Sequence, residues 1–276
     1  MTGFATLGLT SGFALNRANE QLFQATNRMA TGLRINRGAD DPAGLISSER
    51  LDAMLAQLDA ETRTIERQRA VTRTADGALS TVSDQLNRAD ALAVAAANTG
   101  GVSDAEREAM QMELDSIVES VGRTVGRAEF NGDRLFDGTT TLRQGDAELV
   151  VPELTGSSLG ETEIDGQTFS LSSASTALNL SSGRLDDLRA VVDTARSQVL
   201  GARGSIGAFE RNVLEPAERS TRVQFEQTSA ALSVLRDADF AAEASNATRA
   251  GILGFAATGA LRAEQQAAGS IISLLA

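Results

Sequence analysis

A seven-residue repeat of apolar side chains constrains the fold of this chain more than any other feature of its sequence. Between residues 51 and 93, one position in every seven is apolar or, once, threonine: Leu51, Leu58, Ile65, Thr72, Leu79, Leu86 and Ala93. Side chains spaced in this way form the contact stripe of a helix that packs lengthwise against other helices. A helix of about 50 residues would be roughly 75 Å long. The repeat therefore predicts long packed helices and not a compact globule.

Further apolar stripes predict further long helices. They run over residues 15–29, 110–128, 185–213 and 253–274. Ser103 followed by Glu106 is typical of a capping box that opens the third helix. Pro216 should kink or interrupt the helix after residue 213, because proline removes one backbone hydrogen bond. The matching stripes at the two ends of the chain predict that the terminal helices pair with each other.

Two shorter regions lie between the helices. Residues 32–44 are rich in glycine and include Pro42, which predicts a structured connector. Residues 136–180 hold short runs with strand character among Gly, Thr, Ser and Asp, which predicts a small insert of β-hairpins. The fold class is therefore predicted as mainly α: a long antiparallel helical rod, similar to a coiled-coil bundle, with a small β-hairpin insert.

The composition argues against most enzymes. The chain has no His, Cys, Trp or Tyr, and all 25 of its basic residues are Arg. Imidazole bases, thiolate nucleophiles, Schiff-base lysines and the common zinc ligands are therefore missing. Asp40 and Asp41 beside Glu49 allow two interpretations. One is an acid–base pair or metal site, and the other is a turn in which the Asp carboxylates accept backbone N–H bonds; the turn is favoured. We expect no catalytic activity, no cofactor and no metal.

Charge and hydropathy restrict the partners in the same way. The formal net charge is −12 and only 4% of the residues are aromatic, which disfavours nucleic-acid binding. No apolar stretch approaches the ~18 residues of a membrane span, so no membrane insertion is expected. The first residues lack the basic and apolar regions of a cleaved signal peptide.

Five motifs, in the same order along the chain, resemble those of bacterial flagellins. They are residues 29–51 (beginning Met-Ala-Thr-Gly-Leu-Arg-Ile-Asn-Arg), 74–79 (Thr-Ala-Asp-Gly-Ala-Leu), 129–135 (Glu-Phe-Asn-Gly-Asp-Arg-Leu), 236–246 and 270–275. The resemblance covers roughly residues 1–140 and 180–276 and is that of a minimal, short-insert flagellin. It implies an inner-core helix and the start of the connector (1–40), outer-core rod helices (41–135), the insert (136–180), an outer-core rod helix (181–235) and a C-terminal inner-core helix (236–276).

The resemblance also implies a function and partners. The chain is expected to be a structural subunit that polymerises with itself into the flagellar filament, outside the cell, after export by the flagellar type III route. Hook-associated junction and cap proteins are the implied partners, together with an export chaperone at the C-terminal helix. The alternative is a hook–filament junction protein of the same architecture.

Two groups of residues are assigned roles by these arguments. The predicted assembly interface of the inner core consists of Leu15, Leu22, Met29, Leu253, Ala257, Ile271 and Leu274. Flagellins resemble ligands of a Toll-like innate receptor, and Arg88, Leu92 and Glu113 match family positions of that contact. Asp90 and Ala91 depart from the charged pair usual there. The alternative for these residues is that they face solvent or neighbouring subunits.

Overall fold

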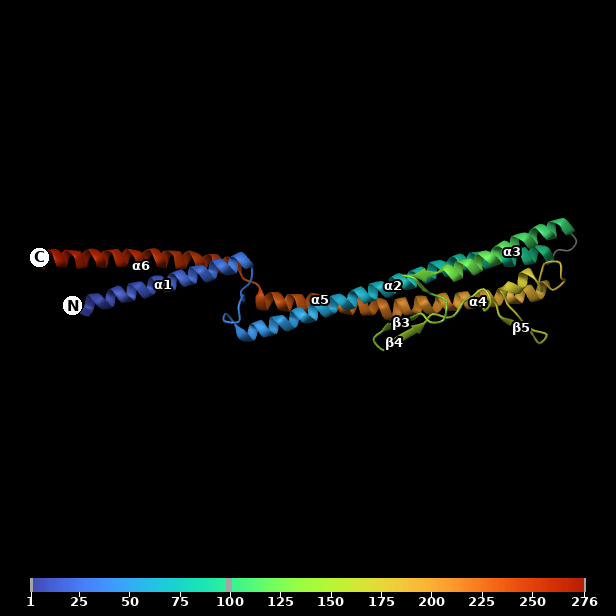
Figure 1. Cartoon of the computed structure of the whole chain (residues 1–276), viewed down its shortest axis with the longest axis horizontal. Helices are drawn as coiled ribbons and strands as arrows, with labels where there is room; N and C mark the ends of the chain where they lie inside the picture. Colours follow the sequence, from blue (N-terminus) through green and yellow to red (C-terminus); the bar gives the residue numbers. More distant parts are fainter. Residues whose placement is uncertain (1, 98–100, 276) are drawn as a thin grey trace. The chain divides into compact units, whose positions relative to one another are not determined.

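Long helices and short antiparallel strand pairs make up the chain, as the sequence predicts (Figure 1). The computed structural model describes residues 2–97 and 101–275, with side chains described over 10–97, 101–267 and 269–270. The helices of these residues are α1 (Thr2–Thr31), α2 (Pro42–Ala97), α3 (Asp104–Arg127), α4 (Leu185–Phe209), α5 (Glu215–Arg236) and α6 (Phe240–Leu275). The mainly α fold class is therefore confirmed.

The chain divides into two compact units. The terminal unit comprises Met1–Leu58 and Gln224–Ala276, and the central unit comprises Asp59–Val223. Helices α2 and α5 contribute residues to both units. The five-segment division inferred from the resemblance uses other boundaries and stays a prediction.

In the terminal unit, α1 and α6 lie side by side and antiparallel (Figure 1). Small side chains allow the close contact: Ala18, Ala25, Ala250 and Ala257 are all buried. A Cβ atom added to Gly254 would lie 4.0 Å from the Cβ of Ala18. The predicted pairing of the terminal helices is thus confirmed.

The two connectors of the terminal unit pair through their backbones. Leu33 and Asp237 form an antiparallel bridge. The Arg34 N–H donates to the carbonyl of Arg236 at 2.7 Å, and the Ala238 N–H donates to the carbonyl of Gly32 at 2.9 Å. Gly32 has φ +72°, a backbone conformation that favours glycine. The chain therefore leaves α1 and enters α6 through one hydrogen-bonded junction.

The carboxylates before α2 serve the turn, as the favoured interpretation predicts. Asp40 Oδ2 accepts hydrogen bonds from the backbone N–H groups of Asn36 (3.0 Å) and Arg37 (2.9 Å), which lower the pKa of Asp40. Asp41 Oδ1 accepts from the N–H of Gly44 at 2.9 Å and so caps the helix. Pro42 occupies the first helical position, where its missing N–H costs nothing.

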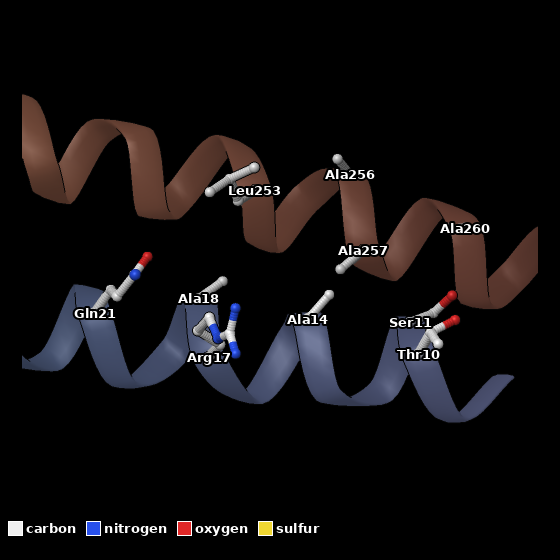
Figure 2. Close-up of a pocket in the computed structure, with 10 residues that line it drawn as sticks. All are labelled: Thr10, Ser11, Ala14, Arg17, Ala18, Gln21, Leu253, Ala256, Ala257 and Ala260. Atoms are coloured by element: carbon white, nitrogen blue, oxygen red, sulfur yellow. The ribbon is translucent and has the colours of Figure 1, made fainter. Parts of the chain in front are cut away.

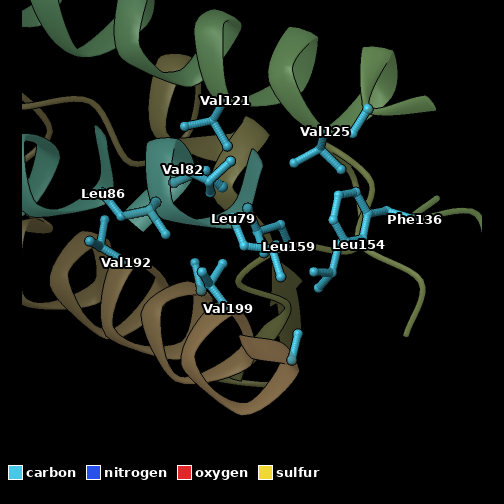
Figure 3. Packing of buried hydrophobic residues seen from close by; sticks show 14 of the residues in the cluster. Leu79, Val82, Leu86, Val121, Val125, Phe136, Leu154, Leu159, Val192 and Val199 are labelled. Atoms are coloured by element: carbon cyan, nitrogen blue, oxygen red, sulfur yellow. The ribbon is translucent and has the colours of Figure 1, made fainter. Parts of the chain in front are cut away.

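The core of the central unit is built from one face each of α2, α3 and α4 (Figure 3). The seven-residue repeat of α2 faces this core: Ile65, Thr72, Leu79, Leu86 and Ala93 are buried. Figure 3 shows side chains of α2, α3, α4 and the insert converging: Leu79, Val82 and Leu86 with Val121, Val125, Val192, Val199, Phe136, Leu154 and Leu159. The repeat that predicts lengthwise helix packing is therefore confirmed.

Helix α3 begins with the predicted capping box. The Ser103 hydroxyl accepts from the N–H of Glu106 at 3.3 Å, and Glu106 Oε2 accepts from the N–H of Ser103 at 2.8 Å. These bonds lower the pKa of Glu106.

The insert consists of antiparallel hairpins and a short 3-10 helix. Its strands are β3 (Thr141–Gln144) with β4 (Ala147–Val150), and β5 (Thr162–Ile164) with β6 (Gln167–Phe169), and its 3-10 helix is η1 (Leu171–Ser175). The strand pair β1 (Glu129–Phe130) and β2 (Asp133–Arg134) precedes the insert. Two glutamines hold the insert to the helices. Gln198 Oε1 accepts from the N–H of Gly160 at 2.8 Å, and Gln111 Oε1 accepts from the N–H of Leu180 at 2.7 Å.

Gly160 is the tightest point of this attachment, and we expect Gly160→Ala to destabilise the central unit. Its φ is +75°, and an added Cβ would lie 2.7 Å from the carbonyl oxygen of Val191. Left-handed backbone strain and overpacking together predict a loss of roughly 2–5 kcal/mol. Gly166, in the β5–β6 turn, has φ +77° but open space around it. Gly166→Ala is therefore the matched control and should cost only about 1–2 kcal/mol in denaturant unfolding. Equal losses would contradict the close-packing argument.

The helix before Pro216 is interrupted, as predicted, but by a single π turn and not by a break in helical structure. The π segment η2 covers Glu210–Leu214, and α5 begins at once and runs through Pro216. The N–H of Glu215 donates to the carbonyl of Glu210, the i→i+5 bond of a π turn. Glu210 also forms ion pairs with Arg69 (3.5 Å) and Arg73 (3.6 Å).

Candidate assembly surface

Exposed apolar side chains are concentrated on the terminal unit. Of the sixteen large apolar residues that are exposed among the described side chains, eleven belong to this unit. They are Phe13, Leu22, Phe23, Ile46, Met54, Phe225, Val234, Phe240, Ile252, Leu253 and Phe255. A concentration of exposed apolar side chains is typical of surfaces that contact other molecules.

The phenylalanines show the same division more sharply. In the central unit, Phe136, Phe169 and Phe209 are buried, and Phe130 packs against the same core. In the terminal unit, every phenylalanine with a described side chain is exposed, and the exposed fraction reaches 71% for Phe13 and 82% for Phe255. The core of the central unit thus uses its aromatic rings internally, whereas the terminal unit presents its own to the outside.

A groove follows one side of the α1–α6 pair (Figure 2). Figure 2 shows Ala14 and Ala18 of α1 opposite Leu253 and Ala257 of α6. Polar side chains of α1 border it: Thr10, Ser11, Arg17 and Gln21. Ser11 donates a hydrogen bond to Glu264 Oε1 at 2.9 Å. This side of the helix pair combines an apolar floor with a polar border.

A second groove lies between the same two helices and is lined by larger apolar side chains. Leu15 and Leu22 of α1 line it together with Phe255 of α6. Gly251 and Gly254 line the α6 side of this groove and have no side chains to fill it. A further groove, lined by Arg28, Glu243 and Arg249, is polar, and its Arg28–Glu243 ion pair measures 3.1 Å.

The structure separates the predicted assembly residues into distinct places. Leu15 and Leu22 share the groove with Phe255, and Leu253 and Ala257 line the groove of Figure 2. Ala257 is buried and contributes mainly to the contact between α1 and α6. Met29 is half-buried and lines neither of these two grooves. The side chains of Ile271 and Leu274 lie outside the described residues. The assembly role of all seven residues stays a prediction.

Sequence reasoning missed the exposed phenylalanines of the terminal unit. Phe13, Phe23 and Phe255 lie off the stripes on which the predicted interface is based. A large apolar residue outside the stripe of an amphipathic helix is itself a signal of a second contact face. That signal is present in the sequence.

The residues matched to the innate-receptor contact lie on α2 and α3. Arg88 and Glu113 are exposed, whereas Leu92 is half-buried and packs against the core. Asp90, which departs from the family pattern, faces Arg189 of α4 at 3.6 Å and Arg196 at 3.9 Å. Receptor contact at these residues stays a prediction.

The two units also differ in charge. The terminal unit carries 8 arginines and 10 carboxylates, and the central unit carries 17 arginines and 27 carboxylates. Their formal charges are therefore −2 and −10. No group of three or more carboxylates within the described ranges is arranged to hold a metal ion. None of the helices, as far as they are described, has a stretch long and apolar enough to cross a membrane.

Paired terminal helices that expose large apolar side chains are typical of proteins that associate with other chains. Family descriptions agree with this class: "bacterial flagellin N-terminal helical region" matches residues 9–141 and "bacterial flagellin C-terminal helical region" matches residues 189–275. The chain belongs to the bacterial flagellin family. This assignment confirms the resemblance found in the sequence.

Individual relatives support the same assignment. Flagellin of Bacillus subtilis (strain 168) is 30% identical, with 90% of each chain covered. Flagellin of Halalkalibacterium halodurans is 32% identical, with 96% of this chain and 94% of the relative covered. A solved structure described as a flagellar hook-associated protein from Vibrio parahaemolyticus has a TM-score of 0.55 at 18% identity, and covers 71% of this chain and 99% of that one. This last likeness concerns the fold alone.

Proposed function

We propose that this chain polymerises into a bacterial flagellar filament through the exposed apolar surface of its terminal unit. The flagellin relatives support a structural subunit of the filament, outside the cell. The observation that carries the assembly surface is the exposure of eleven large apolar side chains on the terminal unit. Burial against neighbouring subunits would remove this surface from water.

The charge distribution supports the same surface. The terminal unit is nearly neutral, so copies of it approach one another with little electrostatic repulsion. The central unit carries most of the net charge, which favours solubility and opposes close apolar contact there. Both the exposed apolar side chains and the low net charge therefore favour assembly through the terminal unit.

The remaining partners follow from the family. We infer that hook-associated junction and cap proteins contact the ends of the filament, and that the chain reaches it by the flagellar type III export route. An export chaperone is expected to cover α6 before assembly. Residues 250–261 of α6 contain no charged side chain, which suits a helix that a chaperone covers before assembly and neighbouring subunits cover afterwards.

Seeded growth tests the proposed function against the junction-protein alternative. Purified full-length chain should elongate fragments of its own filaments, with growth proportional to the number of fragment ends, as seen by electron microscopy. A junction protein would bind those ends once and stop. Binding without elongation would therefore overturn the filament-subunit proposal.

A further inference from the structure

The buried stripe of the C-terminal helices shifts by one residue at the π segment. Along α4, Val192, Val199 and Ile206 are buried at seven-residue intervals, so the next positions should be 213, 220 and 227. The buried positions are instead Leu214, Thr221 and Thr228. A π turn adds one residue to a helix. The π segment η2 (Glu210–Leu214) covers the interval in which the buried positions shift, from Ile206 to Leu214. The π turn thus accommodates one extra residue.

The uninterrupted repeat remains visible on α5 as a second apolar stripe. It would place Val213, Ser220, Gln227 and Val234 toward the inside, with Val223 and Ala230 at intermediate positions. Val223 is 50% exposed and Val234 is 78% exposed, although β-branched apolar residues gain little on a solvated helix face. The stripe that faces inward comprises Leu214, Ala217, Thr221, Thr228 and Leu235. Each stripe combines apolar residues with two polar ones, and the two stripes lie one residue apart.

Polar contacts hold the observed register. Glu218 pairs with Arg69 of α2, and Arg236 donates to Asp52 Oδ2 at 2.6 Å. The Thr228 hydroxyl contacts Met54 Sδ at 3.7 Å. Pro216 lowers the cost of leaving this register, because proline has no N–H to donate to the carbonyl of Asn212. A π turn that moves past this point has one hydrogen bond fewer to break.

We propose that α5 is a two-register helix. The π turn migrates from residues 210–214 toward the connector at 237–239, and the Val223–Val234 stripe replaces the Leu214–Leu235 stripe on the inside. The intervening residues then move by about 1.5 Å along the helix axis and roughly 100° around it. Ion pairs of Glu218 and Arg236 are lost and two valines are buried, so the alternative register is a minor state. The subunit thereby has two helical conformations without unfolding.

Engineered cysteine pairs distinguish the registers, because the chain contains no cysteine of its own. Met54→Cys with Thr228→Cys reports the observed register, and Met54→Cys with Gln227→Cys reports the alternative. For a minor state of roughly 0.1–10%, the second pair should form a disulfide roughly 10- to 1,000-fold more slowly than the first. The measurement uses full-length monomer, so it does not depend on assembly. A second pair that never closes would overturn the proposal.

Two backgrounds serve as controls. Val223→Ser with Val234→Ser removes the apolar gain of the alternative register at exposed positions, so the fold should be unaffected. A chain lacking Val213 has no extra residue and should contain no π turn. In both backgrounds, closure of the 54–227 pair should fall by at least about tenfold, whereas closure of the 54–228 pair should not change. If Val213 cannot be deleted without unfolding, the serine background decides alone. An unchanged rate for the 54–227 pair there would overturn the proposal.

Discussion

Replacing Phe255 by alanine is expected to raise the concentration needed for filament growth by roughly 10- to 100-fold. Phe255 is 82% exposed in the chain and borders the groove of Leu15 and Leu22, so a neighbouring subunit would bury almost the whole ring. Full burial of a phenylalanine contributes roughly 1.5–3 kcal/mol, and 1.4 kcal/mol corresponds to about a tenfold change in an equilibrium constant. Sedimentation of polymer at a series of protein concentrations measures the change.

The monomer provides the internal control for this variant. Because the ring makes little contact within its own chain, the denaturation midpoint of Phe255→Ala monomer should match that of the wild type. Met112 of α3 is 63% exposed and belongs to the central unit, so Met112→Ala is the matched exposed residue. If Met112→Ala impairs growth as much as Phe255→Ala, the assembly surface is not confined to the terminal unit as proposed.

The largest loss of folding stability is expected for Leu86→Asp. Leu86 is completely buried in the seven-residue stripe of α2 and lies among the side chains of Figure 3. The substitution removes a large apolar side chain and places an unpaired carboxylate in the core, which predicts a loss of roughly 3–5 kcal/mol. Guanidinium unfolding followed by circular dichroism gives the free energy of unfolding.

Val94→Asp is the matched control, because Val94 lies on the same helix but is 50% exposed. A new carboxylate there should change the free energy of unfolding by no more than about 0.5 kcal/mol. Similar losses for the two variants would show that the stripe of residues 51–93 does not face the core in solution.

Most of the fold was predictable because its determinants are local or periodic. The Ser103–Glu106 capping box, the Asp40–Asp41 turn and the stripe of α2 each follow from short-range chemistry or from helix spacing. The attachment of the insert was not predictable in the same way. The side-chain oxygens of Gln111 and Gln198 accept hydrogen bonds from backbone N–H groups that are far away in sequence. Nothing in the sequence near either glutamine indicates which N–H group it binds.

The exposed residues of the proposed assembly surface could be predicted only in part. The apolar stripes include Leu22 and Leu253, which the structure exposes, but they also include Ala257, which is buried. Only the three-dimensional pairing of α1 and α6 determines which face of each helix is buried within the pair and which face stays exposed. The position of the π turn was missed for a related reason. Val213 and Leu214 are adjacent apolar residues, and burial alone shows which of them continues the stripe.

The bridge between the two connectors has a mechanical consequence. Because Arg34 and Ala238 bond the opposite connector on either side of the Leu33–Asp237 bridge, a pull on α1 reaches α6 without passing through the seam between the two helices. Both chain ends therefore share a load that enters at either one. Rupture of the junction requires the bonds of Arg34 and Ala238 to fail together, so a force that loosens one connector must overcome the resistance of both.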